Sequence, residues 1–405
     1  MVCVLYFLRR RLERDIKTLR LKKKEDRRLR RGHPWAFSNE FDKGALSGIE
    51  PGELVVLEDH SGKPVGIGYA NPHSLIAVRL LTRKKEDITF ELIKGRIAEA
   101  KKLRESFYPD RDTYRAVFSE SDMLPGLVVD RYGQWLSIQV LTAGIERLGP
   151  DVLRALDDVY GPEGMVLRND SSLRAMEGLP QEKTVVKGDY AGPVTVLVEG
   201  LRFKVDLMEG QKTGFFLDQV DNYSLLDGIS EGADVLDLFC HTGAWSLYSA
   251  RAGAKTVTGI DSSANALKLA GDNAGLNGVE NVNFLRADAF DALKNFLGSG
   301  KRFDVIVSDP PAFIKSRARL AEGLKGYRDL NVKAMKLVTP GGYLISCSCS
   351  FHLDRERFVE MLRESASGAG RSVRMLELRS QSKDHPVLLA APETEYLKCA
   401  LLQVL

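Results

Sequence analysis

Two cysteines that could do chemistry lie close together near the C-terminus of the chain. Cys347 and Cys349 belong to the run Ser346-Cys347-Ser348-Cys349-Ser350, which follows an apolar stretch that begins at Gly341-Gly342. A thiol at the end of a strand can act as a nucleophile if its pKa falls below the usual value of about 8.5. The run also suits buried structural thiols, or a Cys-x-Cys-x2-His metal site at His352 that would still need a fourth ligand.

A carboxylate and two prolines follow another apolar run. Asp309-Pro310-Pro311-Ala312-Phe313 comes directly after Val305-Ile306-Val307-Ser308. Two adjacent prolines fix an extended turn with few backbone donors, so the turn presents the Asp309 carboxylate and the proline carbonyl groups. A plain turn is the alternative, but a position at the end of the fourth strand in a series favours a site.

Three further acids follow three successive apolar runs. Asp237 begins the motif Asp237-Leu238-Phe239-Cys240-His241-Thr242-Gly243, Asp261 follows Gly259-Ile260, and Asp288 follows the next run. The first motif is not G-x-G-x-x-G, which argues against a dinucleotide site, and its Gly243 would let a ligand approach the backbone closely. Each acid alone could be a helix N-cap. Three acids at the ends of successive parallel strands instead predict a nucleoside-containing cofactor, whose ribose hydroxyls a carboxylate can bind.

The segment Gly210–Gln219, with the sequence GQKTGFFLDQ, precedes this series and combines glycines, polar donors and aromatic side chains. Its composition favours a flap that contacts cofactor or substrate. A hydrophobic lid loop with incidental polarity is the alternative interpretation.

The elements that must position these residues alternate between strand and helix over residues 200–405. Strands are expected at 235–239, 257–260, 282–285, 305–307 and 344–346, and helices at 244–252 and 265–277. Near-continuous apolar strands separated by helices indicate a mostly parallel sheet covered on both faces, that is, an α/β fold. Such a sheet binds its ligand at the carboxyl ends of the strands.

Two smaller domains are expected before this one, so the predicted boundaries are 18–84, 85–200 and 201–405. Short strands at 54–57, 65–69 and 75–81, with a helix at 24–31, indicate a small β-barrel in the first domain. The second domain mixes both periodicities and is expected to be α+β. Its expected helices are 89–107 and 152–159, and its expected strands are 127–129, 135–140, 184–187 and 194–197.

Composition and charge restrict the class of protein. The 405 residues are 44% apolar and 28% charged, which excludes a disordered, collagen-like or mucin-like chain. Five cysteines are too few for a disulfide scaffold and suit a reducing, cytoplasmic location, and the chain has no apolar run long enough to predict a membrane span. Residues 1–31 carry 13 Lys or Arg against four Asp or Glu, a net charge of +9 in a chain whose total is +3. Such a basic block predicts a polyanionic partner such as a nucleic acid.

Taken together, these motifs resemble the class I S-adenosylmethionine (SAM)-dependent RNA methyltransferases, and in particular the large-subunit rRNA cytosine-C5 methyltransferases of the RlmI (YccW) type. Four motifs carry the resemblance in the C-terminal half: Gly210–Gln219, Asp237–Gly243, Asp309–Phe313 and Ser346–Ser350. Residues 29–37, LRRGHPWAF, resemble the start of the family's RNA-binding PUA domain, and residues 121–133, SDMLPGLVVDRYG, resemble its central domain. The resemblance therefore covers nearly the whole chain from about Thr18.

The resemblance implies a SAM site and a nucleophile. The residues expected to bind the cofactor are Gln211, Phe215, Asp237, Phe239, Gly243, Asp261, Asp288 and Asp309. Gln211 and Phe215 would close over it. Cys349 aligns best with the family's nucleophile, and Cys347 is the alternate.

A related group of RNA cytosine methyltransferases carries a second cysteine at the position of Ala312, so this chain must remove the C5 proton with another base. Asp309 and Glu393 are the candidates for that base.

The expected function is the formation of 5-methylcytosine in large-subunit rRNA, through a covalent bond between the cysteine and C6 of the base. RNA is the expected partner and a membrane is not, while the oligomeric state is left open, a homodimer included. Two other functions stay open. One is methylation of a guanine nitrogen in rRNA, which needs no thiol. The other is RNA binding or ribosome assembly without catalysis.

Overall fold

The computed structural model describes residues 16–210 and 213–405, which divide into two compact units. Of the described residues, the first unit comprises 16–106, 116–190 and 388–392. The second unit comprises residues 107–115, 191–387 and 393–405. No helix among the described residues is long and apolar enough to cross a membrane. The three domain boundaries expected from the sequence stay predictions.

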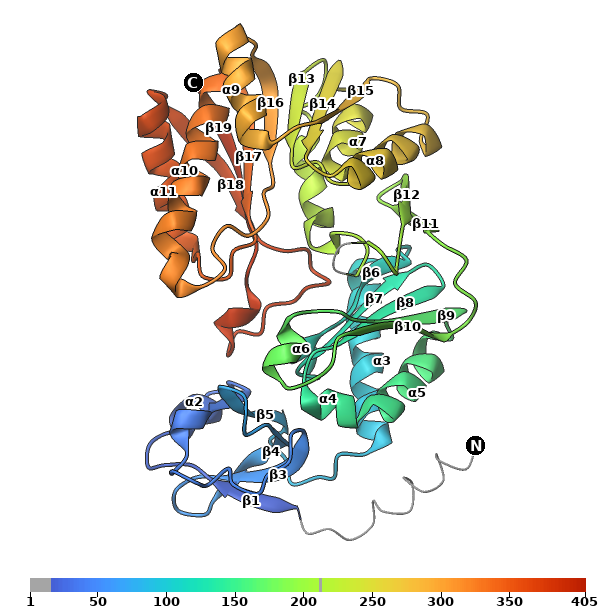
Figure 1. Cartoon of the computed structure of the whole chain (residues 1–405), viewed down its shortest axis with the longest axis vertical. Coiled ribbons are helices and arrows are strands. Elements are labelled where there is room, and N and C mark those ends of the chain that lie inside the picture. The colour runs from blue at the N-terminus through green and yellow to red at the C-terminus, as the bar shows by residue number, and fades with distance from the viewer. Residues whose placement is uncertain (1–15, 211–212) are drawn as a thin grey trace. The chain divides into compact units, whose positions relative to one another are not determined.

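The first unit begins with a five-stranded sheet (Figure 1). Its strands, in spatial order, are β1 (Lys17–Arg20), β3 (Glu53–Glu58), β4 (Pro64–Ala70), β5 (Ile76–Thr82) and β2 (Trp35–Phe37), the last followed by the 3-10 helix η1 (Ser38–Glu40). An isolated bridge between Leu21 and Phe41 links the chain just after β1 to the chain just after β2 and η1, so the two edges of the sheet meet. The sheet therefore curls into the barrel that the sequence predicts.

Helix α2 (Asp26–Arg30) lies against this barrel through Leu29, which is fully buried in the barrel core. It is shorter than the expected helix at 24–31. Lys24 has a φ of 77°, outside the range of a right-handed helix, so the helix cannot begin there.

A second sheet follows, in which the order is β10-β9-β8-β7-β6. Its strands are β6 (Thr113–Phe118), β7 (Leu127–Tyr132), β8 (Trp135–Val140), β9 (Gly164–Asn169) and β10 (Glu182–Lys187). The helices are α3 (Phe90–Phe107), α4 (Ala143–Arg147), α5 (Gly149–Tyr160), α6 (Leu173–Met176) and the 3-10 helix η2 (Ser119–Asp122). Helix α3 buries Ile93, Ile97 and Ala100 along one face, as the helical spacing of its apolar residues predicts.

The second unit is built on a seven-stranded sheet with the order β15-β14-β13-β16-β17-β19-β18. Its strands are β13 (Asp234–Leu238), β14 (Thr256–Asp261), β15 (Val282–Arg286), β16 (Phe303–Ser308), β17 (Val338–Ser348), β18 (Val373–Arg379) and β19 (Lys398–Val404). All pairs from β15 to β17 are parallel, as expected, whereas β19 is antiparallel to both β17 and β18. A hairpin of β11 (Val194–Val198) and β12 (Leu201–Val205) precedes the sheet.

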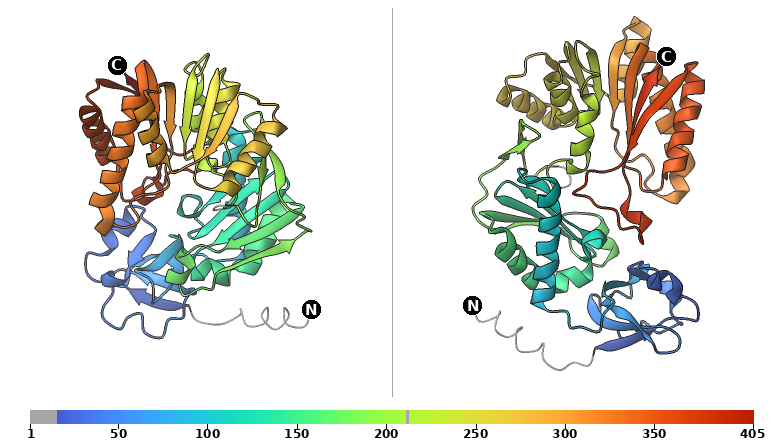
Figure 2. Two further views of the ribbon diagram at one scale, coloured as in Figure 1. Left: turned by 45° about the horizontal axis from the view of Figure 1, so that its top comes forward. Right: turned by 180° about the vertical axis from the view of Figure 1, so that it is seen from behind.

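Helices cover both faces of this sheet (Figure 2). They are α7 (Ala244–Arg251), α8 (Ala264–Leu276), α9 (Ala289–Ser299), α10 (Leu320–Leu337) and α11 (Arg355–Ala369), with the 3-10 helices η3 (Leu217–Leu226), η4 (Arg317–Arg319) and η5 (Pro392–Thr394). Helices α9, α10 and α11 share one hydrophobic core with one face of the sheet. Because crossovers between parallel strands are right-handed and the chain reverses direction after β15, α7 and α8 pack on the opposite face.

The reversal of the strand order falls between β13 and β16. The chain runs outward from β13 to β14 and β15 and then returns to β16 on the other side of β13. Leu238 pairs with both Ile260 and Ser308, and Ser308 pairs with Ser346, so the carboxyl ends of four strands lie in register. This reversal is the place where open α/β sheets bind their ligands.

Candidate active site

A cavity of about 590 Å³ opens at these strand ends. Its lining comes from seven parts of the second unit: η3 and the segment before it, the turn after β13, the start of α7, Asp261–Ser263, Asp309–Ala312, Cys349 and Leu397. A volume of this size can hold a nucleoside-containing cofactor together with part of a substrate.

The turn after β13 has an unusual backbone. Phe239 and His241 line the cavity with φ values of 64° and 48°, which side chains other than glycine rarely adopt. Such conformations cost of order 1–3 kcal/mol each and cluster at functional sites. Gly243 has a φ of 84°, and a Cβ there would lie 3.0 Å from the Phe284 ring. Close packing thus requires this glycine, which is not among the described residues that line the cavity.

The three strand-end acids occupy different places. Asp261 lines the cavity, and its two carboxylate oxygens accept hydrogen bonds from the backbone N–H groups of His241 (3.0 Å) and Ser263 (2.9 Å). Asp288 is exposed and caps α9, accepting from the N–H groups of Phe290 and Asp291. Of the two, Asp261 is the one at the cavity wall, and a role for Asp288 toward the cofactor stays a prediction.

Asp237 is fully buried behind the wall. Its Oδ2 accepts a hydrogen bond of 2.6 Å from the Ser246 hydroxyl, and its Oδ1 has no hydrogen-bond partner among the described residues. Burial, with the nearby charges of Asp309 and Asp261, raises the pKa of Asp237 to about 8. The carboxyl group is therefore mostly protonated at neutral pH, and it is not among the residues that line the cavity.

Asp309 is held in place by two side chains. Its Oδ2 accepts hydrogen bonds of 3.1 Å from Gln219 Nε2 and from Trp245 Nε1. Gln219 lies on η3 and Trp245 on α7, so two elements fix the carboxylate at the end of β16. Gln219 and Trp245 line the cavity. The sequence predicted Gln219 only as the last residue of the flap segment, and it gave no signal for Trp245.

The two clustered cysteines lie in different surroundings. Cys349 is partly exposed and lines the cavity, where its thiol donates to the Pro310 carbonyl oxygen at 3.9 Å. Cys347 is buried, and its Sγ lies 3.3 Å from that of Cys399, the residue opposite on β19. Burial and the Cys399 thiol raise the pKa of Cys347 well above its ordinary value. Only Cys349 of this pair therefore has access to a ligand in the cavity.

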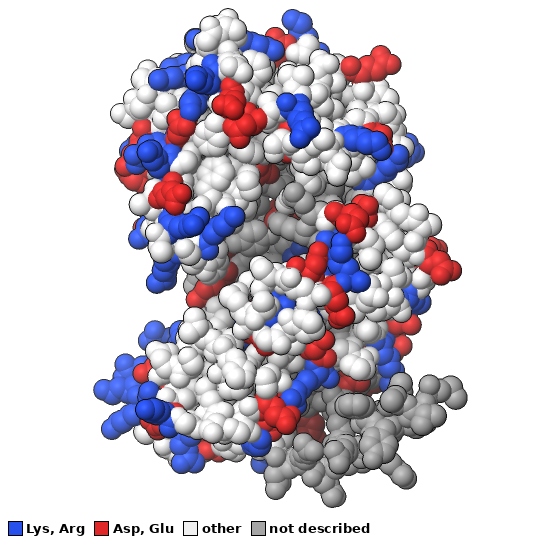
Figure 3. Space-filling view, viewed as in Figure 1, with Lys and Arg blue, Asp and Glu red and all other residues white. Residues whose placement is uncertain are grey.

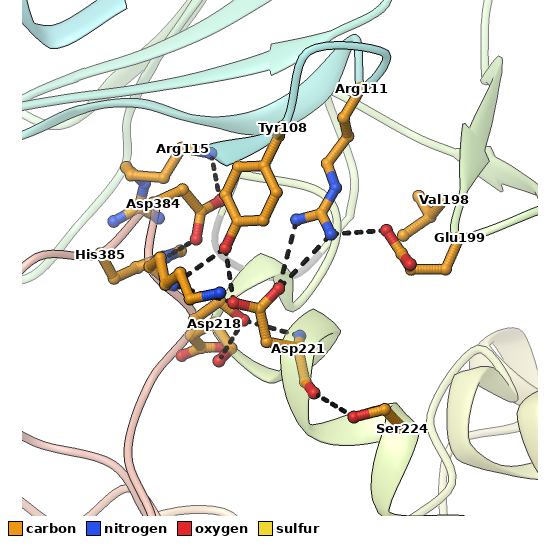
Figure 4. A network of polar contacts seen from close by, with 12 residues as sticks. Tyr108, Arg111, Arg115, Val198, Glu199, Asp218, Asp221, Ser224, Asp384 and His385 are labelled. Atoms are coloured by element: carbon orange, nitrogen blue, oxygen red, sulfur yellow. Dashed lines mark hydrogen bonds and ion pairs between the residues drawn. The ribbon is translucent and has the colours of Figure 1, made fainter. Parts of the chain in front are cut away.

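The 3-10 helix η3 is anchored by the polar network of Figure 4. Tyr108 donates a hydrogen bond to Asp221 of η3, and the Arg111 guanidinium lies over the Tyr108 ring and against the same carboxylate. Ser382 donates its hydroxyl to the backbone oxygen of Asp218 and accepts from the Asp221 N–H group. Two distant segments of the chain thereby fix the helix that carries the cavity residues of η3.

The same network includes a buried carboxylate–imidazole pair. Asp384 and His385 lie 2.8 Å apart, and the Arg115 N–H group donates to the second oxygen of Asp384. The charge of His385 and these hydrogen bonds lower the pKa of Asp384 against the effect of its burial. This pair ties the loop after β18 to the segment that begins β6.

The remaining candidate residues are also placed, with one exception. Phe215 is buried, lines the cavity and packs on the Phe203 ring at 5.0 Å between ring centres. Glu393 lies in η5 and is not among the described lining residues. Gln211 lies outside the described residues. Asp218, which lines the cavity and accepts a 2.6 Å hydrogen bond from Tyr396, was not singled out in the sequence.

Comparison with known proteins identifies the family. Residues 19–83 match a PUA-like domain, and residues 182–391 match an S-adenosylmethionine-dependent methyltransferase. The chain is 36% identical to the ribosomal RNA large subunit methyltransferase I of Shewanella denitrificans, over 95% of this chain and 99% of the relative. The protein of the same name from Aeromonas hydrophila is 37% identical, over 93% and 97%. The chain belongs to the ribosomal RNA large subunit methyltransferase I family.

Members of this methyltransferase I family are similar to the chain along almost its whole length, and solved structures share its fold. A Streptococcus mutans protein assigned as a SAM-dependent methyltransferase matches with a TM-score of 0.83 and 21% identity, over 96% of this chain and 100% of the other. The methyl donor of the chain is thus SAM, which confirms the predicted nucleoside-containing cofactor. Within residues 16–210 and 213–405, no group of three or more His, Cys, Asp or Glu side chains could hold a metal ion.

The cavity residues fit SAM. The Asp261 carboxylate stands at the wall where ribose hydroxyls can donate to it, and Phe239 offers an apolar face beside it. The turn from Phe239 to Thr242 and the carboxylates of Asp218 and Asp309 surround the rest of the cavity, which suits a ligand with a positively charged group.

Proposed function

We propose that the chain methylates C5 of a cytosine in large-subunit rRNA and that Cys349 forms a transient covalent bond with C6 of that base. The observation that supports this is the position of Cys349. Its thiol shares one cavity with the Asp309-Pro310-Pro311 turn and with Asp261, the acid at the wall. A methyltransferase that acts on a guanine nitrogen would not need a thiol there.

The chemistry explains why a thiol is useful. Carbon C5 of cytosine is a poor nucleophile, and bound SAM supplies an activated methyl group. When the Cys349 thiolate adds to C6, the electron pair of the C5–C6 double bond becomes available at C5, which takes the methyl group. A base then removes the proton from C5, the double bond re-forms, and the thiolate leaves.

Asp309 is the better placed of the two candidate bases. It lines the cavity beside Cys349, whereas Glu393 does not. Its Oδ2 accepts hydrogen bonds from Gln219 and Trp245, which fix the direction of the carboxylate at the cavity wall. Asp309 could instead bind the polar edge of the cytosine, because a carboxylate accepts hydrogen bonds from the exocyclic amino group.

Basic residues of the barrel supply the affinity for rRNA in this proposal. Lys23, Lys24, Arg27 and Arg31 are exposed around α2 and make no ion pair within the described part of the chain. Figure 3 shows Lys and Arg side chains gathered at this edge of the barrel. Unpaired cations of this kind neutralise phosphates and release counterions, so binding should weaken steeply with salt. The target base must also leave its stack to enter the cavity.

The decisive experiment traps the covalent bond. RNA that contains 5-fluorocytosine at the target position should form a stable adduct with the wild-type protein, because fluorine at C5 cannot be removed as a proton is. Cys349→Ser should form no adduct and should lose methyl transfer, since a hydroxyl is a far weaker nucleophile at neutral pH. Cys347→Ser, two residues earlier and still on β17, is the matched control and should retain both.

The outcomes separate the alternatives. If Cys349→Ser still transfers methyl groups near the wild-type rate, the thiol mechanism is wrong, and mapping of the product on guanine would favour nitrogen methylation. If Cys347→Ser is inactive and Cys349→Ser is active, the nucleophile has been misassigned. A chain that binds RNA without binding SAM or transferring methyl groups would act in ribosome assembly without catalysis.

A further inference from the structure

A buried lysine lies directly behind Cys349. Lys398 begins β19 and is only 4% exposed, although lysine is among the residues least often buried. Its Nζ donates to the backbone oxygens of Ser350 (2.8 Å) and Tyr396 (2.7 Å). Neither acceptor carries a charge, and Lys398 forms no ion pair with any described residue.

The Lys398 side chain reaches the chain beside Cys349. Lys398 pairs with Ser348 across the β17–β19 ladder, and its side chain reaches the carbonyl group of Ser350. Cys349 lies between those two residues, and Leu397 lines the cavity beside it. Lys398 is therefore fixed to the chain on both sides of Cys349.

Burying a cation in this position destabilises the fold unless other groups compensate for its lost hydration. A buried ammonium group loses its hydration, and two neutral carbonyl oxygens do not repay that loss as a carboxylate would. Burial lowers the pKa of Lys398 to about 8, and Cys349 is the strongest of the charges that oppose this lowering. The ammonium group also has three N–H donors, of which the described residues accept two.

Most other titratable groups around the thiol are acids. The carboxyl groups of the cavity lining are Asp218, Asp261 and Asp309, and His241 lies in the same lining. Tyr327 and Tyr396 are near Cys349, while Asp354 and Glu395 are near Lys398, with Arg355 3.9 Å from Glu395. A carboxylate near a thiol opposes its ionisation, whereas the two tyrosines, whose pKa values burial raises, are neutral. The described lining of the cavity contains three Asp and neither Lys nor Arg. The described lining thus supplies no lysine or arginine to a thiolate at Cys349, whereas Lys398 lies behind it.

We propose that Lys398 is a positioning residue that stabilises the thiolate of Cys349 and so makes it a nucleophile before RNA arrives. The thiol releases its proton to solvent, and the ammonium group keeps its own protons and faces the new negative charge. This inference rests on the proposed function, because the thiolate is useful only as a nucleophile. The protonation of the thiol can nevertheless be measured without RNA.

The test measures the pH dependence of alkylation. Full-length protein is treated with iodoacetamide over a pH series, and the modified Cys349 peptide is quantified by mass spectrometry. The peptide readout separates Cys349 from Cys240 and Cys347, whose pKa values burial raises. In the wild-type chain the midpoint for Cys349 should lie below the ordinary value of about 8.5.

Removing the positive charge of Lys398 should raise the midpoint of Cys349 alkylation. Lys398→Met keeps the length of the side chain and should move the midpoint upward by about 1 pH unit or more. The alkylation rate at pH 7 should fall about three- to tenfold, because the smaller thiolate fraction is partly offset by a more basic thiolate. Lys398→Arg should restore most of the wild-type midpoint. Lys336→Met, which removes an exposed cation from the last turn of α10, is the matched control and should change nothing.

An unchanged midpoint in a folded Lys398→Met variant would overturn the inference. If that variant does not fold, the wild-type midpoint decides, since a value at or above about 8.5 contradicts a stabilised thiolate. The two proposals fail separately. A shifted midpoint without an adduct on 5-fluorocytosine RNA leaves the role of Lys398 standing and removes the cytosine mechanism. An adduct on that RNA without a shifted midpoint removes the role of Lys398 and leaves the cytosine mechanism standing.

Discussion

Asp237→Asn should stabilise the second unit at neutral and alkaline pH. Asp237 is fully buried on β13, and burial raises its pKa to about 8 even though the Ser246 hydroxyl donates to the carboxylate. In the unfolded chain the same group has an ordinary pKa of about 3.9. Between these two values the folded state holds a proton that the unfolded state has released.

The sign and the size of the effect follow from this difference. Because unfolding releases the proton, the free energy of unfolding falls by about 1.4 kcal/mol for each pH unit between about 4 and 8. From pH 5 to pH 8 the carboxyl group should cost the fold about 3–4 kcal/mol. An amide has no proton to lose, so the variant should escape this loss. At pH 5 the two proteins should be similar, since the amide oxygen can accept from Ser246 as the protonated acid does.

Scanning calorimetry without SAM at pH 5 and pH 8 measures the difference. The transition of the second unit is the one that added SAM moves upward, because a ligand that binds the folded state stabilises it. Asp234→Asn removes a partly exposed carboxylate from the beginning of the same strand and controls for the change in net charge. If the gain in stability from Asp237→Asn does not grow between pH 5 and pH 8, the reasoning is refuted.

Two further predictions concern the ligands. Asp261→Ala should weaken SAM binding by about 1–3 kcal/mol, because the ribose would lose a charged acceptor, and calorimetry that shows an unchanged Kd would contradict this assignment. Arg27→Ala and Arg31→Ala should each lower the slope of log Kd for RNA against log salt by up to about 0.9, the contribution of one phosphate contact. SAM affinity should not change in either variant, and wild-type slopes in both would remove α2 from the RNA-binding surface.

The sequence predicts the parallel half of the sheet well and its antiparallel end poorly. Strands β13 (DVLDL) and β14 (TVTGID) are short, mostly buried segments between turn residues, so they can be recognised locally. Strand β18 is largely exposed, and its sequence VRMLELR gives no apolar run. Its pairing with β19 joins segments that are separated by a loop and η5, and such pairing cannot be derived from local periodicity.

In the candidate site, too, the sequence predicts the residues that carry a local signal and misses those placed by contacts distant in the chain. The acids at strand ends were found because their position after an apolar run is a local signal. Trp245 lies on an apolar helix and looks like a core residue, and its hydrogen bond to Asp309 joins side chains that are 64 residues apart in the chain. Gln219 lies in a segment that was recognised as a flap, but its particular role depends on η3 and on the network that anchors it.

The choice between the two cysteines depends on where β17 ends. In a continuing strand, residues two apart point to the same face, so Cys347 and Cys349 should be equivalent. Strand β17 ends at Ser348, and Cys349 lies just beyond it, where the alternation no longer holds. Ser350 fixes the chain at this point, because its hydroxyl contacts Tyr327 and its carbonyl oxygen accepts from Lys398. The groups that end the strand therefore also turn one thiol into the cavity and place the lysine behind it, while Cys347 stays against β19.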